Sequence, residues 1–139
     1  MIQTIHINYL AVLVAAISSM VLGFLWYGPL FGKTWMKLTS FDKKKMDEAK
    51  KKEMGKTVAA AFISALLMSY ILAHFVVYAQ AATWIDGVVA GFWIWLGFVA
   101  TVMFGMVLWE GKPLKLYLIN ASHYLVVLAV MGAILAVWR

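Results

Sequence analysis

Four long apolar runs constrain the fold of this chain more than any other feature of its sequence. They cover residues 7–31, 57–79, 84–109 and 114–138. Each is longer than the roughly 20 residues that a helix needs to cross about 30 Å of hydrocarbon. Lipid offers a backbone amide no hydrogen-bond partner, so each run is expected to form a transmembrane helix. The sequence therefore predicts an all-α integral membrane protein, with residues 1–139 forming a single domain and its helices a four-helix bundle.

The composition agrees with this prediction and excludes several other classes of protein. Hydrophobic residues make up 65% of the chain and charged residues 13%, and the mean hydropathy is +0.88. A soluble domain is nearer half apolar and a quarter charged, so a soluble enzyme, a disordered chain and a coiled coil are excluded. The absence of cysteine excludes disulfides, thiolate metal sites and thiol catalysis. The first run is longer than a signal-peptide core and lacks a basic segment before it, so we interpret it as a retained helix.

The lysines predict the orientation of the chain in the membrane. Most of them lie between Lys33 and Lys56, and Lys112 and Lys115 flank the connection between the third and fourth runs. These two connections lie on the same side of a four-span chain, and only the C-terminal arginine lies on the other. By the positive-inside rule, the loop of residues 32–56 is cytoplasmic and both termini face outside. We therefore expect a multi-pass protein of the bacterial plasma (inner) membrane, whose net charge of +6 needs no nucleic-acid partner.

The cytoplasmic loop favours a short charged helix. Asp47 and Lys51, and likewise Glu48 and Lys52, are opposite charges at i,i+4 spacing. We expect this helix to end near Gly55. Two interpretations stay open for the loop: a solvated determinant of topology, or a surface that binds anionic headgroups of membrane lipids or a partner protein.

An aromatic segment follows the first run and is interpreted as the exit of the chain from the membrane. Trp26, Tyr27 and Trp35 surround the dipeptide Gly28-Pro29. Tryptophan and tyrosine favour headgroup depth, where the apolar ring is buried and its polar edge stays wet. Proline lacks an amide proton and restricts the residue before it, so Pro29 is expected to break the helix. We favour this anchoring role over a ligand site.

Small residues recur every four positions along three runs and predict close packing of helices. In lipid, small residues let two backbones approach each other and make dispersion contacts. Such a stripe serves a helix of the same chain or of another subunit, and we expect the protein to form a homo-oligomer. The stripes are Ala11, Ala15, Ser19 and Gly23; Ala61, Ala65, Ser69 and Ala73; and Gly97, Thr101 and Gly105.

The third run is expected to begin at a capping box and to carry two deep tryptophans. Thr83 and Asp86 have the spacing in which each side chain accepts from the other residue's amide, so we interpret Asp86 as a cap rather than a functional acid. Trp93 and Trp95 lie deeper in the membrane and must be buried or face lipid.

Polar residues inside the membrane are the candidate binding residues. Tyr70 and His74 share one face of the second helix, and Asn120, His123 and Tyr124 share one face of the fourth. One interpretation is structural: interhelical hydrogen bonds that fix the packing register, each worth about 0.6 kcal/mol. The other is a polar seam that binds or passes a small solute. The sequence carries no ligand spacing for a metal, no phosphate-binding loop and no catalytic motif, so no metal, cofactor or catalytic residue is predicted.

Several segments together resemble a known family. They are Asn8–Ala16, Leu22–Trp35, Gly97–Thr101, Glu110–Lys115 and Met131–Leu135. This set is similar to the small bacterial membrane proteins grouped as domain-of-unknown-function family 1761, with the tryptophan- and proline-containing element as its most specific part. The resemblance covers nearly the whole chain and implies four transmembrane helices, but no activity, cofactor or catalytic residue.

Two positions depart from the pattern of that family. Gly28 stands where serine is usual before the proline, and Asn120 stands where an acid is often found. The second departure removes a possible intramembrane charge and so argues against a proton relay in this chain.

The leading hypothesis is a non-enzymatic, self-associating membrane protein that binds or passes a small solute at the polar seam. The alternative is a membrane scaffold that acts through its lysine-rich cytoplasmic loop. A membrane enzyme acting on a lipid or quinone is a third, less favoured interpretation.

Overall fold

The computed structural model describes residues 5–39 and 43–138, with the side chains of residues 43–52 left aside, and this part of the chain is helical without a strand. The first half holds α1 (Tyr9–Leu25), the π-helix η1 (Trp26–Leu30), α2 (Gly32–Thr39) and α3 (Lys43–Tyr78). The second half holds α4 (Trp84–Ile94), the π-helix η2 (Trp95–Ala100), α5 (Thr101–Met103), α6 (Gly105–Leu108) and α7 (Leu114–Val137).

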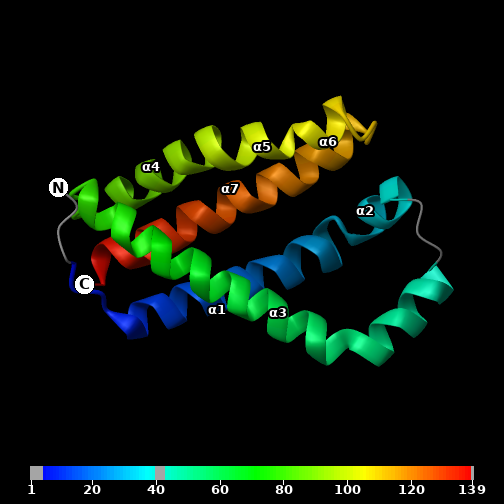
Figure 1. Ribbon diagram of the computed structural model, residues 1–139, viewed down its shortest axis with the longest axis horizontal. Helices are drawn as coiled ribbons and strands as arrows, with labels where there is room; N and C mark the ends of the chain where they lie inside the picture. The colour runs from blue at the N-terminus through cyan, green and yellow to red at the C-terminus, as the bar shows by residue number, and fades with distance from the viewer. Residues whose placement is uncertain (1–4, 40–42, 139) are drawn as a thin grey trace.

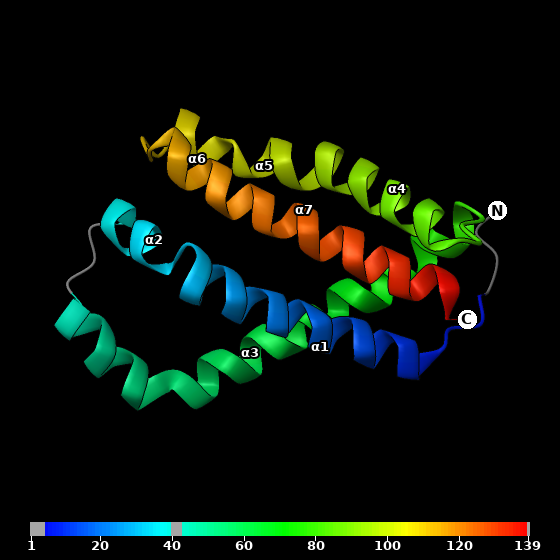
Figure 2. The same cartoon turned by 180° about the vertical axis from the view of Figure 1, so that it is seen from behind.

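Four of these helical segments are long and apolar enough to cross a membrane, which agrees with the predicted number of spans. They are Tyr9–Leu30, Glu53–Tyr78, Trp84–Leu108 and Leu114–Val137. The chain runs up and down four times, so that the start of α1, the turn from α3 to α4 and the end of α7 lie together (Figure 1). At the opposite end lie α2, the start of α3 and the turn from α6 to α7, as the view from behind also shows (Figure 2).

The second span corrects one expectation about the cytoplasmic loop. The charged helix does not end near Gly55, because α3 runs without a break from Lys43 to Tyr78. Glycine in a helix interior costs only about 1 kcal/mol, and the apolar run that follows propagates the helix. The expected pairs Asp47–Lys51 and Glu48–Lys52 lie outside the described side chains.

The first span ends in a π-helix, which refines the predicted break at Pro29. Pro29 lies inside η1 instead of ending a helix. The amide of Phe31 donates to the carbonyl of Trp26 at 2.8 Å, a bond across five residues. A widened turn of this kind accommodates a residue without an N–H. The chain breaks only at Phe31, whose φ is −123°.

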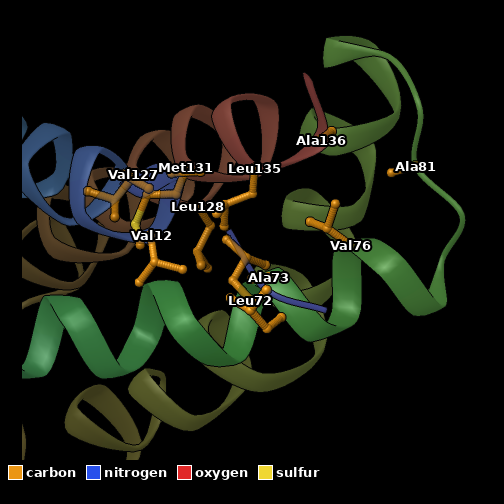
Figure 3. Close-up of a cluster of buried hydrophobic side chains, with 13 residues drawn as sticks. Val12, Leu72, Ala73, Val76, Ala81, Val127, Leu128, Met131, Leu135 and Ala136 are labelled. Atoms are coloured by element: carbon orange, nitrogen blue, oxygen red, sulfur yellow. The ribbon is translucent and has the colours of Figure 1, made fainter. Parts of the chain in front are cut away.

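The small-residue stripes of the first two helices pack against each other over the half of the bundle nearer the chain ends. The sequence predicted close packing but left open which helix each stripe meets. Ala11 and Ala15 of α1 are fully buried, and so is Ser69 of α3. The Ser69 hydroxyl donates to the carbonyl of Val12 at 2.9 Å. Around this contact lies the apolar core, in which side chains of α1, α3 and α7 meet (Figure 3).

Glycines that were not part of the predicted stripes bring α4 and α7 together. A Cβ built on Gly87 would collide with the carbonyl of Gly132, and one built on Gly91 would collide with the carbonyl of Leu128. The backbones of these two helices therefore touch. By contrast, a Cβ built on Gly97 would meet nothing within 4 Å, so this position of the third predicted stripe makes no close contact with another described helix.

The start of α4 is the predicted capping box. The Asp86 amide donates to Thr83 Oγ1 at 3.2 Å, and the Thr83 amide donates to Asp86 Oδ2 at 3.0 Å. The acid at position 86 therefore caps α4, and the interpretation of this residue is confirmed.

Candidate functional site

The structure divides the predicted polar seam into two places. Asn120, His123 and Tyr124 lie together on α7, as their spacing predicted, but the aromatic segment that faces them belongs to the first span. Tyr70 and His74 of α3 do not line the cavity described below. Sequence spacing identified the shared face of each helix but not the helix opposite it.

Tyr70 and His74 form a local aromatic group on α3. Their rings are 4.8 Å apart, and the ring of Tyr9 on α1 stacks on Tyr70 at 6.4 Å. His74 Nδ1 lies 2.8 Å from the carbonyl of Tyr70, so this nitrogen carries the proton and donates to the carbonyl. Because one ring nitrogen is already bonded within its own helix, this pair is the weaker candidate for a ligand.

His123 is the most unusual polar side chain in the described part of the protein. Only 7% of its surface is exposed, yet neither Nδ1 nor Nε2 has a hydrogen-bond partner. Aromatic rings surround it, with centroid distances of 4.8 Å to Tyr124, 5.0 Å to Tyr27 and 6.2 Å to Trp26. Gly23 of α1 faces it directly, since a Cβ there would lie 3.6 Å from His123 Nε2.

Asn120, one turn before His123, makes an interhelical hydrogen bond, which is the structural one of the two interpretations given for the polar seam. The Tyr27 hydroxyl donates to Asn120 Oδ1 at 2.7 Å. Beside it, the indole N–H of Trp26 donates to the carbonyl of Ile119 at 3.0 Å. These two bonds fix the end of the first span against α7 and leave His123 behind them without a partner.

The aromatic exit segment therefore has contacts that its sequence did not reveal. Trp26 and Tyr27 were predicted as membrane anchors, and their polar atoms are bound to α7. Trp35 of α2 packs edge-on against Tyr27 at 5.9 Å, while Pro29 is exposed. Two adjacent aromatic donors beside a proline were the only signal in the sequence. This pattern is typical of an interfacial anchor as well as of an interhelical contact. The depth of these rings in the membrane stays a prediction.

A cavity of about 450 Å³ opens where α1 and α3 diverge from each other beyond their close contact. The stripes that pack at Ala15 and Ser69 here become cavity lining, at Ser19 and Gly23 of α1 and Ala61 of α3. The remaining lining comes from both helices, η1 and α7: Met20, Phe24, Tyr27, Met54, Thr57, Val58, Ser64, Ala65, Met68, His123 and Tyr124.

The chemistry of this cavity suits an uncharged molecule. Among the described side chains, no Asp, Glu, Lys or Arg lines the cavity. His123 presents one donor and one acceptor when its imidazole is neutral. Methionine and aromatic side chains supply a polarizable apolar wall. In the described part of the chain, no three His, Cys, Asp or Glu side chains lie close enough together to hold a metal ion.

The bond between the first span and α7 is testable by a double-mutant cycle. Tyr27→Phe and Asn120→Leu each remove one partner of the 2.7 Å bond. We expect a coupling free energy of about 0.6 kcal/mol, typical of interhelical hydrogen bonds in membrane proteins. Unfolding of the two single variants and the double variant in mixed detergent micelles measures it. Additive single effects would show that the bond contributes nothing.

The chain matches the model of a known protein family. The family model described as "Protein of unknown function (DUF1761)" matches residues 10–136. No curated protein matches the chain, and no solved structure does.

Proposed function

The chain belongs to this family of unknown function, and we propose that it is a non-catalytic membrane protein that binds a small uncharged molecule in the cavity at His123. The observation that carries the proposal is the pair of unpartnered ring nitrogens on a side chain that is 93% buried, at the wall of a cavity of about 450 Å³.

The physical argument is the cost of a buried polar group without a partner. An unsatisfied donor or acceptor costs about 1 to 3 kcal/mol, and an imidazole presents one of each. A hydroxyl or carbonyl compound in the cavity removes part of this cost when it bonds to His123. An apolar side chain at position 123 would fill the same space without this cost. The presence of a histidine there therefore supports a role beyond packing.

The same comparison separates His123 from its neighbour. Asn120 already has an interhelical partner, as the structural interpretation of the seam requires. His123 makes no such bond, so the register-fixing role does not account for it. We therefore place ligand binding at His123 and Tyr124 and assign Asn120 to the support of the cavity wall.

The binding site is tested with cyclohexanol as the probe, in bicelles, by following the imidazole nitrogens of His123 with ¹⁵N NMR. We expect a saturable change in the His123 signals and none in those of His74, whose Nδ1 is already bonded. Substitution of His123 by leucine assigns the signals. The proposal is wrong if the His123 nitrogens do not respond to the probe.

A glycine variant tests the same site without removing the histidine. Gly23→Ala places a methyl group in ordinary contact with Nε2, at 3.6 Å, and so covers that atom without a clash. We expect cyclohexanol to bind about tenfold more weakly, while helix propensity leaves the stability equal or higher. Gly55→Ala is the matched control, because a Cβ there meets nothing within 4 Å. Equal affinity in the two variants would contradict the proposal.

A second surface supports the predicted contact with anionic lipid headgroups. Lys33 and Lys37 of α2 are exposed, and so are Lys112, in the turn before α7, and Lys115, in the first turn of α7. All four belong to the end of the bundle away from the chain ends (Figure 1). We propose that this end faces the cytoplasm of a plasma membrane and both termini face outside. Self-association also remains a proposal, for which the exposed stripe at Gly97 offers a face.

A further inference from the structure

We propose that the occupant of the cavity is a single-chain lipid with an uncharged hydroxyl or carbonyl head, bound with its head at His123 and its chain along α3. This inference rests on the proposed function and names the ligand class. It comes from a second hollow that continues the first.

The second hollow shares two lining residues with the cavity at His123. Ser64 and Met68 of α3 line both. The second hollow has a volume of about 380 Å³ and runs onward between α3 and the second half of the bundle. Apart from Ser64 its walls are apolar: Leu67, Ile71 and Phe75 of α3, Ile94 of α4, Val99 of η2 and Leu128 of α7.

Polarity is therefore distributed along one track. The cavity holds His123 and the hydroxyl groups of Thr57 and Tyr124, whereas the second hollow offers only carbon and sulfur beyond Ser64. A molecule that matches the whole track has one polar end and one apolar end. A compact solute fills the first hollow only.

The length of the track indicates a chain rather than a ring. From Ser64 to Phe75 the helix α3 rises about 16 Å at 1.5 Å per residue. This distance adds to the cavity that already contains His123. An extended alkyl or isoprenoid chain covers such a length, and apolar side chains accept it without a directional bond.

An uncharged head fits best, because among the described side chains neither hollow is lined by Asp, Glu, Lys or Arg. A phosphate or carboxylate buried there without a cation has a large desolvation penalty. The second hollow opens toward the side of the bundle. Its lining residues Leu67, Ile71 and Phe75 are 62%, 45% and 50% exposed on the outer surface of a candidate membrane span. A lipid therefore enters from the bilayer without crossing water.

Photolabelling with hexadecanol in liposomes tests this placement. One probe carries a diazirine beside its hydroxyl and a second carries it near the end of its chain. We expect the first to label residues around Gly23 and His123, and the second to label Ile71 to Phe75. Excess unlabelled hexadecanol should suppress both.

A matched pair of variants on α3 blocks the track or leaves it open. Ser64→Phe fills the junction of the two hollows, whereas Ile63→Phe adds a ring at a neighbouring position that is 65% exposed. We expect Ser64→Phe to lower labelling by the chain-end probe about tenfold, with Ile63→Phe unchanged. Cyclohexanol should still reach His123 in both variants.

The outcomes separate the inference from the proposed function. Loss of chain-end labelling in Ser64→Phe alone supports the inference. Chain-end labelling that stays on lipid-facing residues such as Phe98, or that excess hexadecanol does not suppress, overturns the inference but leaves cyclohexanol binding at His123 intact. If hexadecanol labelling does not respond to Ser64→Phe and cyclohexanol binding does not respond to Gly23→Ala, both proposals are wrong.

Discussion

Gly132→Ala is expected to lower the free energy of unfolding by about 3 kcal/mol, the upper end of what one added methyl group does in a packed interior. The Cβ of the new residue collides with the carbonyl of Gly87. Because the obstacle is backbone, no side-chain rotation relieves the collision, and α4 and α7 must separate. Their contact is the most extensive between any two helices of the described chain, so the loss spreads along both.

The measurement is unfolding by sodium dodecyl sulfate in mixed micelles, followed by far-ultraviolet circular dichroism. Gly97→Ala is the control, because it makes the same change in the same bundle at a position where a Cβ meets nothing within 4 Å. It should unfold at the wild-type detergent fraction or above it, since alanine favours helix. Similar unfolding of the two variants would show that α4 and α7 are not held by backbone contact.

Trp95→Ala is expected to destabilise the protein by about 2 kcal/mol. The indole N–H of Trp95 donates to the carbonyl of Ala121 at 2.7 Å, and its ring packs against the apolar core. Deletion therefore removes a hydrogen bond and leaves a void between η2 and α7. The effect is smaller than for a soluble core because lipid, unlike water, does not penalise the exposed apolar wall.

Trp93→Ala is the matched control for that deletion. Trp93 lies two residues away on the same span and is 63% exposed. Its side chain contacts lipid in both the folded and the unfolded protein, so its removal changes the stability little. Unfolding in the same mixed micelles should place Trp93→Ala within about 0.5 kcal/mol of the wild type. A loss as large as that of Trp95→Ala would mean that both tryptophans stabilise the bundle.

The pair also shows what sequence could predict about the tryptophans. Their depth in the third run indicated that each is either buried or faces lipid. In the structure Trp95 is partly buried against the core and Trp93 is 63% exposed. Residues two positions apart lie on nearly opposite faces of a helix. Depth in the membrane therefore does not say which of the two tryptophans is buried. The deciding feature is the position of α7, which offers the Ala121 carbonyl to Trp95 only.

Part of the candidate site was also predictable. Residues 120, 123 and 124 share a helix face at i, i+3 and i+4, and the structure keeps them together. Their partner was expected on the second span, at His74, but Tyr27 of the first span contacts them. Spacing along one helix carries no information about which neighbour faces it. The divergence of α1 from α3 that opens the cavity was equally hidden, since the same small-residue stripe packs in one half and lines the cavity in the other.

The number of spans, their up-and-down order and the cap at Asp86 were predictable from the sequence. These properties follow from local physics, because a long apolar run in lipid must bond its own amides and short connections force neighbouring helices antiparallel. Other properties depend on how the helices pack: which faces meet, where two backbones touch at Gly87 and Gly132, and which polar side chain among the described residues is left without a partner. In lipid no hydrophobic gradient drives one apolar face inward, so packing shape alone selects the contacts, and shape is a property of two helices together.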